Sequence, residues 1–309
     1  MLQGVRFINC RFAAVCFEQV QFERVTWQDC QLSTVQWTAC RLEHCTFNAG
    51  RQDDLRWDRC TLRHVSFSKS AMARWHMDSS RCEHLNMIAC RQEGLHCEDS
   101  VFSDASWVDG QVLDWRLAGC RMQRFIVAKT ECRRVLAQAC SGSNVRWIRC
   151  RLHDFSLRDC ELLSAAWSHS HWHGGAINDS ALQTVCFDHA HLSGLVFQQL
   201  RASQALFDHA QVSACDWRGL DAASISLRQA RLDQTQLDNA RLQGLDARGA
   251  ILTEVSLRGA DCRRGKLIGQ DPELWARAQL EGARFCEELT LDDAEWRRIH
   301  QPGFRGVLP

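Results

Sequence analysis

Histidines concentrate in one stretch of the chain, at spacings that suit metal ligation. Six of the thirteen histidines fall between residues 169 and 209, several of them twenty apart: His169, His171, His173, His189, His191 and His209. Imidazole nitrogen is a ligand of zinc and copper. If residues twenty apart lie on neighbouring β-strands, about 4.8 Å apart, two neutral imidazoles could tilt onto one ion. The six are therefore a candidate metal site. The alternative is a solvated polar corner, in which Asp188 and Asp208 are ordinary ion-pair partners.

Cysteine is the second residue type whose spacing could carry chemistry, as disulfides or as a metal site. The chain has 18 cysteines, and no two of them form a CxxC pair of the kind that zinc ribbons use. Stacked pairs such as Cys120 and Cys140 would hold parallel Cβ vectors too far apart for a relaxed disulfide. Fifteen of the 18 fall at sequence numbers ending in 0, 5, 2 or 7. We predict that these are buried core thiols of a reducing compartment.

The numbers ending in 2 or 7 mark a five-residue period that must position all of these side chains. Between Phe7 and Leu267 every such residue is apolar except Gln52, Gln92 and Gly142. A second selected set lies two residues earlier, at numbers ending in 0 or 5, and the other three positions are mostly polar. A period of five fits neither an α-helix nor a long strand. It predicts a short strand and a turn, repeated.

The blocks resemble those of the pentapeptide repeat family, most clearly in NARLQGL, RGAILTEV and RGADCRRG. The resemblance implies an all-β, right-handed parallel β-helix with four blocks per coil, hence about 13 coils over residues 1–270. Residues twenty apart would then stack. Aromatic residues at Phe7, Trp27, Phe47 and Phe67 agree with this offset and predict a stacked ladder inside the tube.

The period breaks after Leu267, and residues 271–309 are expected to form a short, partly helical C-terminal cap. Asp271 could cap a helix with Pro272 at its first position and Glu273 in its first turn. The sequence AQLEGARF, residues 278–285, looks like two further blocks in a shifted register. We expect this cap to cover the open β edge at that end of the β-helix.

The first coil carries no such cover, and we expect it to mediate assembly. Its inward apolar residues would be the interface: Val5, Phe7, Cys10, Phe12 and Phe17. Unpaired β edges template association, so the expected partner is either a second copy of the chain or another protein.

Composition excludes several classes of function. The 37 basic and 37 acidic residues balance, which disfavours nucleic acid as a partner, although arginines recur along two outward edges. No apolar run is long enough to span a bilayer and the start does not resemble a signal peptide, so we expect a cytoplasmic protein without membrane contact. No phosphate loop, GxSxG or HExxH motif occurs. We predict no enzyme activity, no catalytic residues and no cofactor.

These features favour a non-enzymatic interaction scaffold or adaptor. Relatives of the resembled family accompany bacterial secretion systems, which implies an accessory protein of type VI secretion as the favoured role. The alternative is a DNA-mimicking regulator of a type II topoisomerase, as in family members that protect gyrase. Those relatives are strongly acidic, whereas this chain is neutral.

Overall fold

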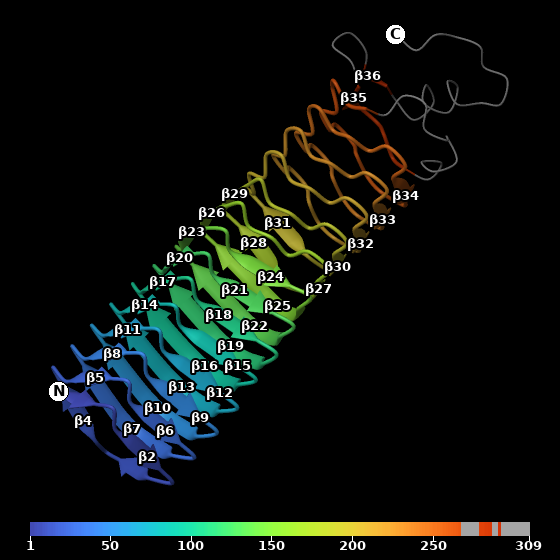
Figure 1. Cartoon of the computed structure of the whole chain (residues 1–309). Helices are drawn as coiled ribbons and strands as arrows, with labels where there is room; N and C mark the ends of the chain where they lie inside the picture. The colour runs from blue at the N-terminus through green and yellow to red at the C-terminus, as the bar shows by residue number, and fades with distance from the viewer. Residues whose placement is uncertain (267–277, 286–289, 292–309) are drawn as a thin grey trace. The chain divides into compact units, whose positions relative to one another are not determined.

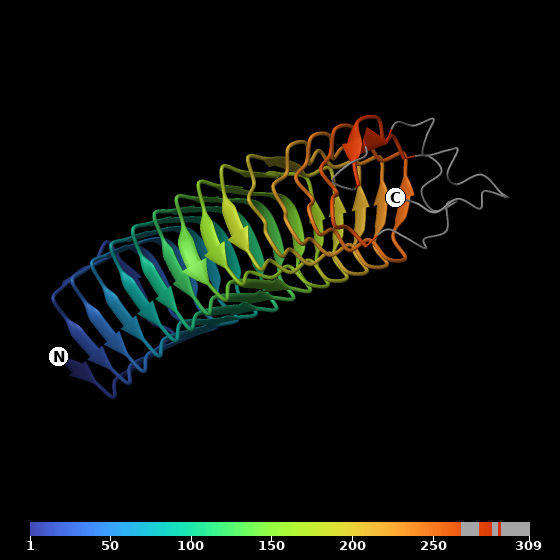
Figure 2. The same cartoon turned by 90° about the horizontal axis from the view of Figure 1, so that it is seen from above.

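The computed structural model describes residues 1–266, 278–285 and 290–291 of the chain. These residues form strands, bridges, bends and turns, and none of them is helical. They belong to two compact units, Met1–Leu162 and Leu163–Pro309. In both units, the chain winds through successive turns whose strands lie side by side with those of the next turn (Figures 1 and 2).

The five-residue block is the building unit of both parts. Residues at numbers ending in 0, 2, 5 and 7 point inward, as Cys30, Leu32, Val35 and Trp37 illustrate with exposures of at most 1%. The residue at each number ending in 4 or 9 takes a left-handed conformation, as Thr34 does with φ of 53°. A left-handed residue turns the chain, and it follows most of the three-residue strands, whereas an eight-residue strand such as β7 (Gln31–Thr38) contains one in its middle.

Three stacks of parallel strands build the first unit. The first stack contains one strand from each turn: β1 (Leu2–Gln3), β5 (Gln21–Glu23), β8 (Arg41–Glu43), β11 (Thr61–Arg63), β14 (Arg81–Glu83), β17 (Val101–Ser103), β20 (Arg121–Gln123) and β23 (Ser141–Ser143). The second stack also contains one strand from each turn: β2 (Arg6–Ile8), β6 (Thr26–Gln28), β9 (Thr46–Asn48), β12 (Ser66–Ser68), β15 (Asn86–Ile88), β18 (Ser106–Val108), β21 (Ile126–Ala128) and β24 (Arg146–Ile148). Eight strands in each stack mean eight turns.

The third stack contains the longest strands of the unit. Its members are β3 (Arg11–Ala13), β4 (Cys16–Glu18), β7 (Gln31–Thr38), β10 (Arg51–Asp58), β13 (Ala71–Asp78), β16 (Arg91–Glu98), β19 (Gln111–Ala118), β22 (Glu131–Gln138) and β25 (Arg151–Arg158). Partners are twenty residues apart throughout, as in Trp57 opposite Trp37. The predicted parallel solenoid with four blocks per turn is therefore confirmed. Strand β26 (Glu161–Leu163) lies at the boundary of the two units.

The second unit uses shorter strands and more isolated bridges. One stack has a strand in each of five turns: β27 (His171–His173), β30 (His191–Ser193), β32 (Gln211–Ser213), β33 (Arg231–Asp233) and β34 (Ile251–Thr253). The other strands are β28 (Ala176–Asn178), which pairs with β31 (Val196–Gln198), and β29 (Ala181–Gln183). Five turns here and eight in the first unit give the predicted total of about 13.

The cores are filled by stacked side chains. In the first unit the ring of Phe47 lies 4.3 Å from that of Trp27 and 4.4 Å from that of Phe67, nearly parallel to both. This confirms the predicted aromatic ladder. A second ladder, which was not predicted, places Trp37 on Trp57 with ring centroids 4.8 Å apart. Of the fifteen cysteines predicted to point inward, all are buried except Cys10 in the first turn, which is half-buried.

The C-terminal segment differs from expectation where the structure describes it. The expected helix around Asp271, Pro272 and Glu273 lies outside the described residues. Residues 278–285 form turns, bridges and the strand β35 (Ala283–Arg284), which pairs antiparallel with β36 (Thr290–Leu291). The partly helical cap is thus not supported. The shifted register is confirmed, because Gln279 bridges to Ser256, 23 residues away instead of twenty.

Candidate functional site: the histidine edge

The predicted histidines lie in the second unit, and three of them occupy equivalent turn positions. His169, His189 and His209 are each the third residue of a tight turn, with φ of 55°, 54° and 57°. Each turn is closed by a backbone hydrogen bond of 3.0 to 3.3 Å, such as that from Ala190 N–H to the Phe187 carbonyl. This kind of turn needs a left-handed third residue, a conformation that histidine adopts more readily than most side chains do.

Hydrogen bonds between turns hold these three histidines in line. The backbone N–H of His169 donates to the Asp188 carbonyl at 3.0 Å, and that of His189 donates to the Asp208 carbonyl at 3.0 Å. Their rings consequently stack: the centroids of His169 and His189 are 5.0 Å apart at 26°, and those of His189 and His209 are 4.6 Å apart at 25°. All three side chains are exposed.

The remaining predicted histidines lie at the starts and ends of the neighbouring strands. His171 in β27 and His191 in β30 are register partners, and their ring centroids are 4.4 Å apart. Partial burial, together with the charge of His171, lowers the pKa of His191. His173 lies next to Ser193, with Nδ1 and Oγ 2.8 Å apart.

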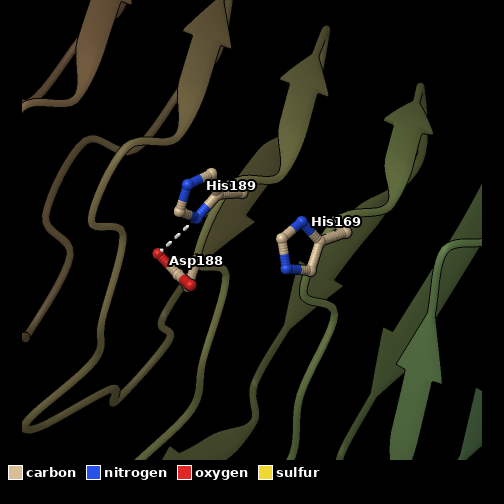
Figure 3. Close-up of side chains that lie close together, drawn as sticks. All are labelled: His169, Asp188 and His189. Carbon is tan, nitrogen blue, oxygen red and sulfur yellow. Dashed lines mark hydrogen bonds and ion pairs between the residues drawn. The ribbon is translucent and has the colours of Figure 1, made fainter.

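A carboxylate completes one part of this edge. Asp188 precedes His189 in the same turn, and its Oδ1 lies 2.9 Å from His189 Nδ1. One ligand atom from each of His169, Asp188 and His189 lies within 4.8 Å of the other two. Figure 3 shows the three side chains gathered at one corner of the coil. We call these three residues the His-Asp-His cluster.

Asp208 occupies the same turn position one coil later but has other partners. Arg228 donates to it through Nε at 2.9 Å, and Ser226 also donates to it. Burial alone would raise the pKa of Asp208, but its hydrogen bonds with Arg228 and Ser226 hold that pKa below the usual value. The cluster therefore includes Asp188 and not Asp208.

A second histidine stack was missed by the sequence reasoning, although its spacing is the same. In the first unit, the rings of His44, His64 and His84 stack almost parallel, with centroids 4.7 Å and 4.5 Å apart. Some loss of hydration within the stack, together with the charges of His84 and His44, lowers the pKa of the exposed His64. The signal that could have revealed this stack is the twenty-residue spacing of its three histidines.

The cysteines do not extend either histidine stack. The 17 described cysteines are free thiols, and most are buried in the tube, whereas the histidines are on its outside. Burial raises the pKa of Cys150 and Cys215 to about 11. Cys150 donates to the carbonyls of Val127 and Ile148 at 3.3 and 3.5 Å. Such thiols act as small core residues.

The residues predicted as an interface lie together in the first turn. Val5, Phe7, Cys10, Phe12 and Phe17 are all half-buried. Their equivalents one turn later are buried, as in Trp27 at 2%, Leu32 at 1% and Trp37 at 0% exposure. These five residues are thus less covered than their equivalents one turn later, and their role as an interface stays a prediction.

A second surface feature was not predicted. The outward side chains of six consecutive strands in the second stack, β6, β9, β12, β15, β18 and β21, include no charged residue. The strands that flank these six in the same stack carry charge: β2 contains Arg6 and β24 contains Arg146. We call this surface the uncharged face. No helix of the described residues is long and apolar enough to cross a membrane.

Sequence comparison identifies the repeats. Residues 1–77 match the family model for the pentapeptide repeat region, and residues 205–244 and 235–269 match that for pentapeptide repeats. No curated protein matches the chain.

Solved structures with some likeness are distant. Trypsin-treated QnrB1, a plasmid-mediated fluoroquinolone resistance protein, is 14% identical, with 59% of this chain and 90% of QnrB1 covered and a TM-score of 0.35. HetL, a pentapeptide repeat protein involved in heterocyst differentiation regulation in the cyanobacterium Nostoc, is 17% identical, with 84% and 89% covered and a TM-score of 0.20. A mannuronic acid specific polysaccharide lyase from human gut microbiota is 6% identical, with 75% and 82% covered and a TM-score of 0.31.

These structural likenesses carry no conclusion about activity. The sequence matches do identify the repeats, and the five-residue register that they describe is the one seen in both units. Residues 1–77 and 205–269 are therefore similar to the repeats of the pentapeptide repeat family.

Proposed function

We propose that this chain is a non-enzymatic scaffold that binds another protein through the uncharged face. The observation that carries this proposal is the absence of charge over six neighbouring strands of a protein in which 24% of residues are charged. Depletion of charged residues is the compositional mark of the core of protein interfaces.

The uncharged face has two chemically different halves. Toward β6 its side chains are small and polar, and they bond to one another, as Ser68 Oγ does to Asn48 Oδ1 at 2.9 Å. Toward β21 they are mostly apolar: Ile88 is 47% exposed, Val108, Ile126 and Ala128 are half-buried beside it, and the polar pair Ser106 and Asn86 is hydrogen-bonded at 2.7 Å. Polar groups already bonded within the face lose little on leaving water, and the apolar half gains from burial.

A shallow hollow adjoins the apolar half. It has a volume of about 400 Å³ and is lined by Ser106 and Ile126 of the face and, beside them, by the Arg124–Asp104 ion pair and Arg146. A hollow beside this face suits a protein partner that inserts one polar or charged side chain there.

The interior gives no comparable opportunity for chemistry. Inward positions of the described turns are filled by large buried side chains such as Trp57, Trp115 and Trp147. Most catalysis requires a concave, partly enclosed site, and pentapeptide repeat proteins are generally non-enzymatic. A filled interior with a distinctive outer surface supports binding over catalysis.

The favoured setting for this scaffold is type VI secretion, as an accessory protein that binds a spike component. The test is to mix the purified chain with a purified, defined spike protein and to measure complex formation by size-exclusion chromatography. Val108→Arg should abolish the complex, because it places a charge at the centre of the apolar half. Gln123→Arg in β20, on another stack, should leave it intact. A complex that survives Val108→Arg would overturn the proposal.

The alternative role as a DNA-mimicking topoisomerase regulator meets a physical objection. Mimicry of DNA needs rows of unneutralised carboxylates, whereas many outward carboxylates here pair with arginine: Asp114 with Arg134, Asp216 with Arg218, Asp246 with Arg248 and Asp261 with Arg263. Supercoiling by a purified type II topoisomerase should therefore be unchanged by this protein. Protection of that enzyme would favour the alternative.

A further inference from the structure

We propose that the His-Asp-His cluster binds one borderline divalent cation, such as Zn²⁺ or Ni²⁺. Among the described residues, this is the one group of three histidine, cysteine or acidic side chains whose ligand atoms all lie within 4.8 Å of one another. Figure 3 shows His169 on one coil and Asp188 and His189 on the next, with their polar ends facing a common space.

The donor set suits this class of ion. Two imidazole nitrogens and one carboxylate oxygen are common ligands of zinc, and imidazole also suits nickel and copper. Bonds of about 2.0 to 2.2 Å require ligand atoms about 3 to 3.5 Å apart. His189 Nδ1 and Asp188 Oδ1 are already 2.9 Å apart, so His169 is the side chain that must approach.

The backbone favours that approach. The N–H of His169 is bonded to the carbonyl of Asp188 itself, which fixes the two turns against each other. The side chains of His189 and Asp188 are 49% and 36% exposed, so rotation of their side chains disturbs no packed core. The rings of His169 and His189 are already inclined by 26°, which is part of the tilt that two imidazoles need to share an ion.

Charge selects this cluster over its neighbours. In the same turn one coil later, Asp208 precedes His209. Its carboxylate, however, already accepts hydrogen bonds from Arg228 and Ser226. Asp188 pairs with His189 and with no arginine of the described residues. Its negative charge therefore remains available for a cation, and water would fill the remaining coordination positions.

The His44, His64 and His84 stack provides an internal control. Its rings are nearly parallel, at 1° and 5°, and it belongs to no such group of three ligands. His64 and His189 both sit at left-handed turn positions, with φ of 52° and 54°. Asparagine tolerates that conformation, so His64→Asn and His189→Asn are matched variants that keep both turns.

The experiment is calorimetry of the whole untagged chain with Zn²⁺ and Ni²⁺, under reducing conditions that do not chelate the metal. We expect one ion per chain, at least tenfold weaker binding in His189→Asn and in Asp188→Asn, and unchanged binding in His64→Asn. Circular dichroism should show equal thermal midpoints for all variants without metal.

Spectroscopy with Co²⁺ provides a second readout that separates this cluster from the cysteines. Ligation by nitrogen and oxygen gives d–d bands without a thiolate-to-metal charge-transfer band, and His189→Asn should remove those bands. Three results would overturn the proposal: binding unchanged in His189→Asn, equal loss in His64→Asn, or a thiolate charge-transfer band in the folded protein.

Discussion

Individual buried thiols give this protein a stability that depends on alkaline pH. Burial raises the pKa of Cys150 and Cys215 to about 11, and that of Cys262 to about 12. An unfolded cysteine has a pKa of about 8.5. Between these values the folded state holds protons that the unfolded state has lost, so the free energy of unfolding falls as pH rises.

We therefore expect the contribution of these thiols to the free energy of unfolding to be fully present below about pH 8.5. It should decline from there to about pH 11. Urea denaturation with a reductant at pH 8 and pH 10 measures the decline. Cys150→Ala should reduce the difference between the two pH values by about 2 kcal/mol, the share of one such thiol. Equal stability at pH 8 and pH 10 would show that these thiols ionise freely in the folded protein.

At the scale of single residues, the sequence predicted which side chains are buried better than it predicted their hydrogen-bond partners. Numbers ending in 0, 2, 5 and 7 located the buried cysteines, because a five-residue period fixes which side chains point inward. The difference between Asp188 and Asp208 was not predicted, since it depends on Arg228 one coil further on. Ring inclination, 26° at His169 and 1° at His44, depends on side-chain torsions that spacing does not determine.

At the scale of the strand and turn, each block includes one left-handed residue that is usually not glycine. Thr34 in β7 is an exposed, β-branched example with φ of 53°, and Gly94 takes the equivalent position three turns later with φ of 69°. A left-handed conformation costs an ordinary residue about 1 to 2 kcal/mol, more when the side chain is branched.

Thr34→Gly should therefore raise the free energy of unfolding by about 1 kcal/mol, because glycine relieves this strain. Thr38→Gly in the same strand is the control, and it should lower the free energy of unfolding by about 1 kcal/mol, since Thr38 has no positive φ. Chemical denaturation measures both. A loss of stability in Thr34→Gly similar to that in Thr38→Gly would contradict the argument.

Sequence periodicity predicted the strands and their twenty-residue register, yet not which stack lacks charge. The uncharged face could have been predicted from the sequence, because the outward residues of this stack lie at numbers ending in 6 and 8, such as Thr26, Asn48 and Val108. The C-terminal segment was harder, because blocks 23 residues from their partners keep the inward pattern while breaking the count.

At the scale of the whole molecule, the half-buried apolar set in the first turn predicts self-association. Phe7 and Phe12 lack the coverage that later turns give to Trp27 and Leu32. Pairing of two such surfaces would bury the aromatic rings and satisfy the edge strands.

Light scattering should show a dimer for the wild-type chain and a monomer for the double variant Phe7→Lys and Phe12→Lys. Ile8→Lys is the matched control, because Ile8 is 53% exposed in the same turn and points outward. It should remain dimeric. A wild-type chain that is monomeric over the micromolar range would contradict this prediction.

The twenty-residue register also governs how the gene for such a protein can change in length. Losing one complete turn, such as residues 86–105, would leave every remaining side chain in its own column. Losing five residues would keep the interior apolar but rotate all later columns by a quarter turn, which would divide the uncharged face. The bridge from Ser256 to Gln279 spans 23 residues instead of twenty, so the stacking of one turn on the next can continue where the count is broken. Surfaces shared by several turns are therefore expected to evolve by duplication or deletion of whole turns.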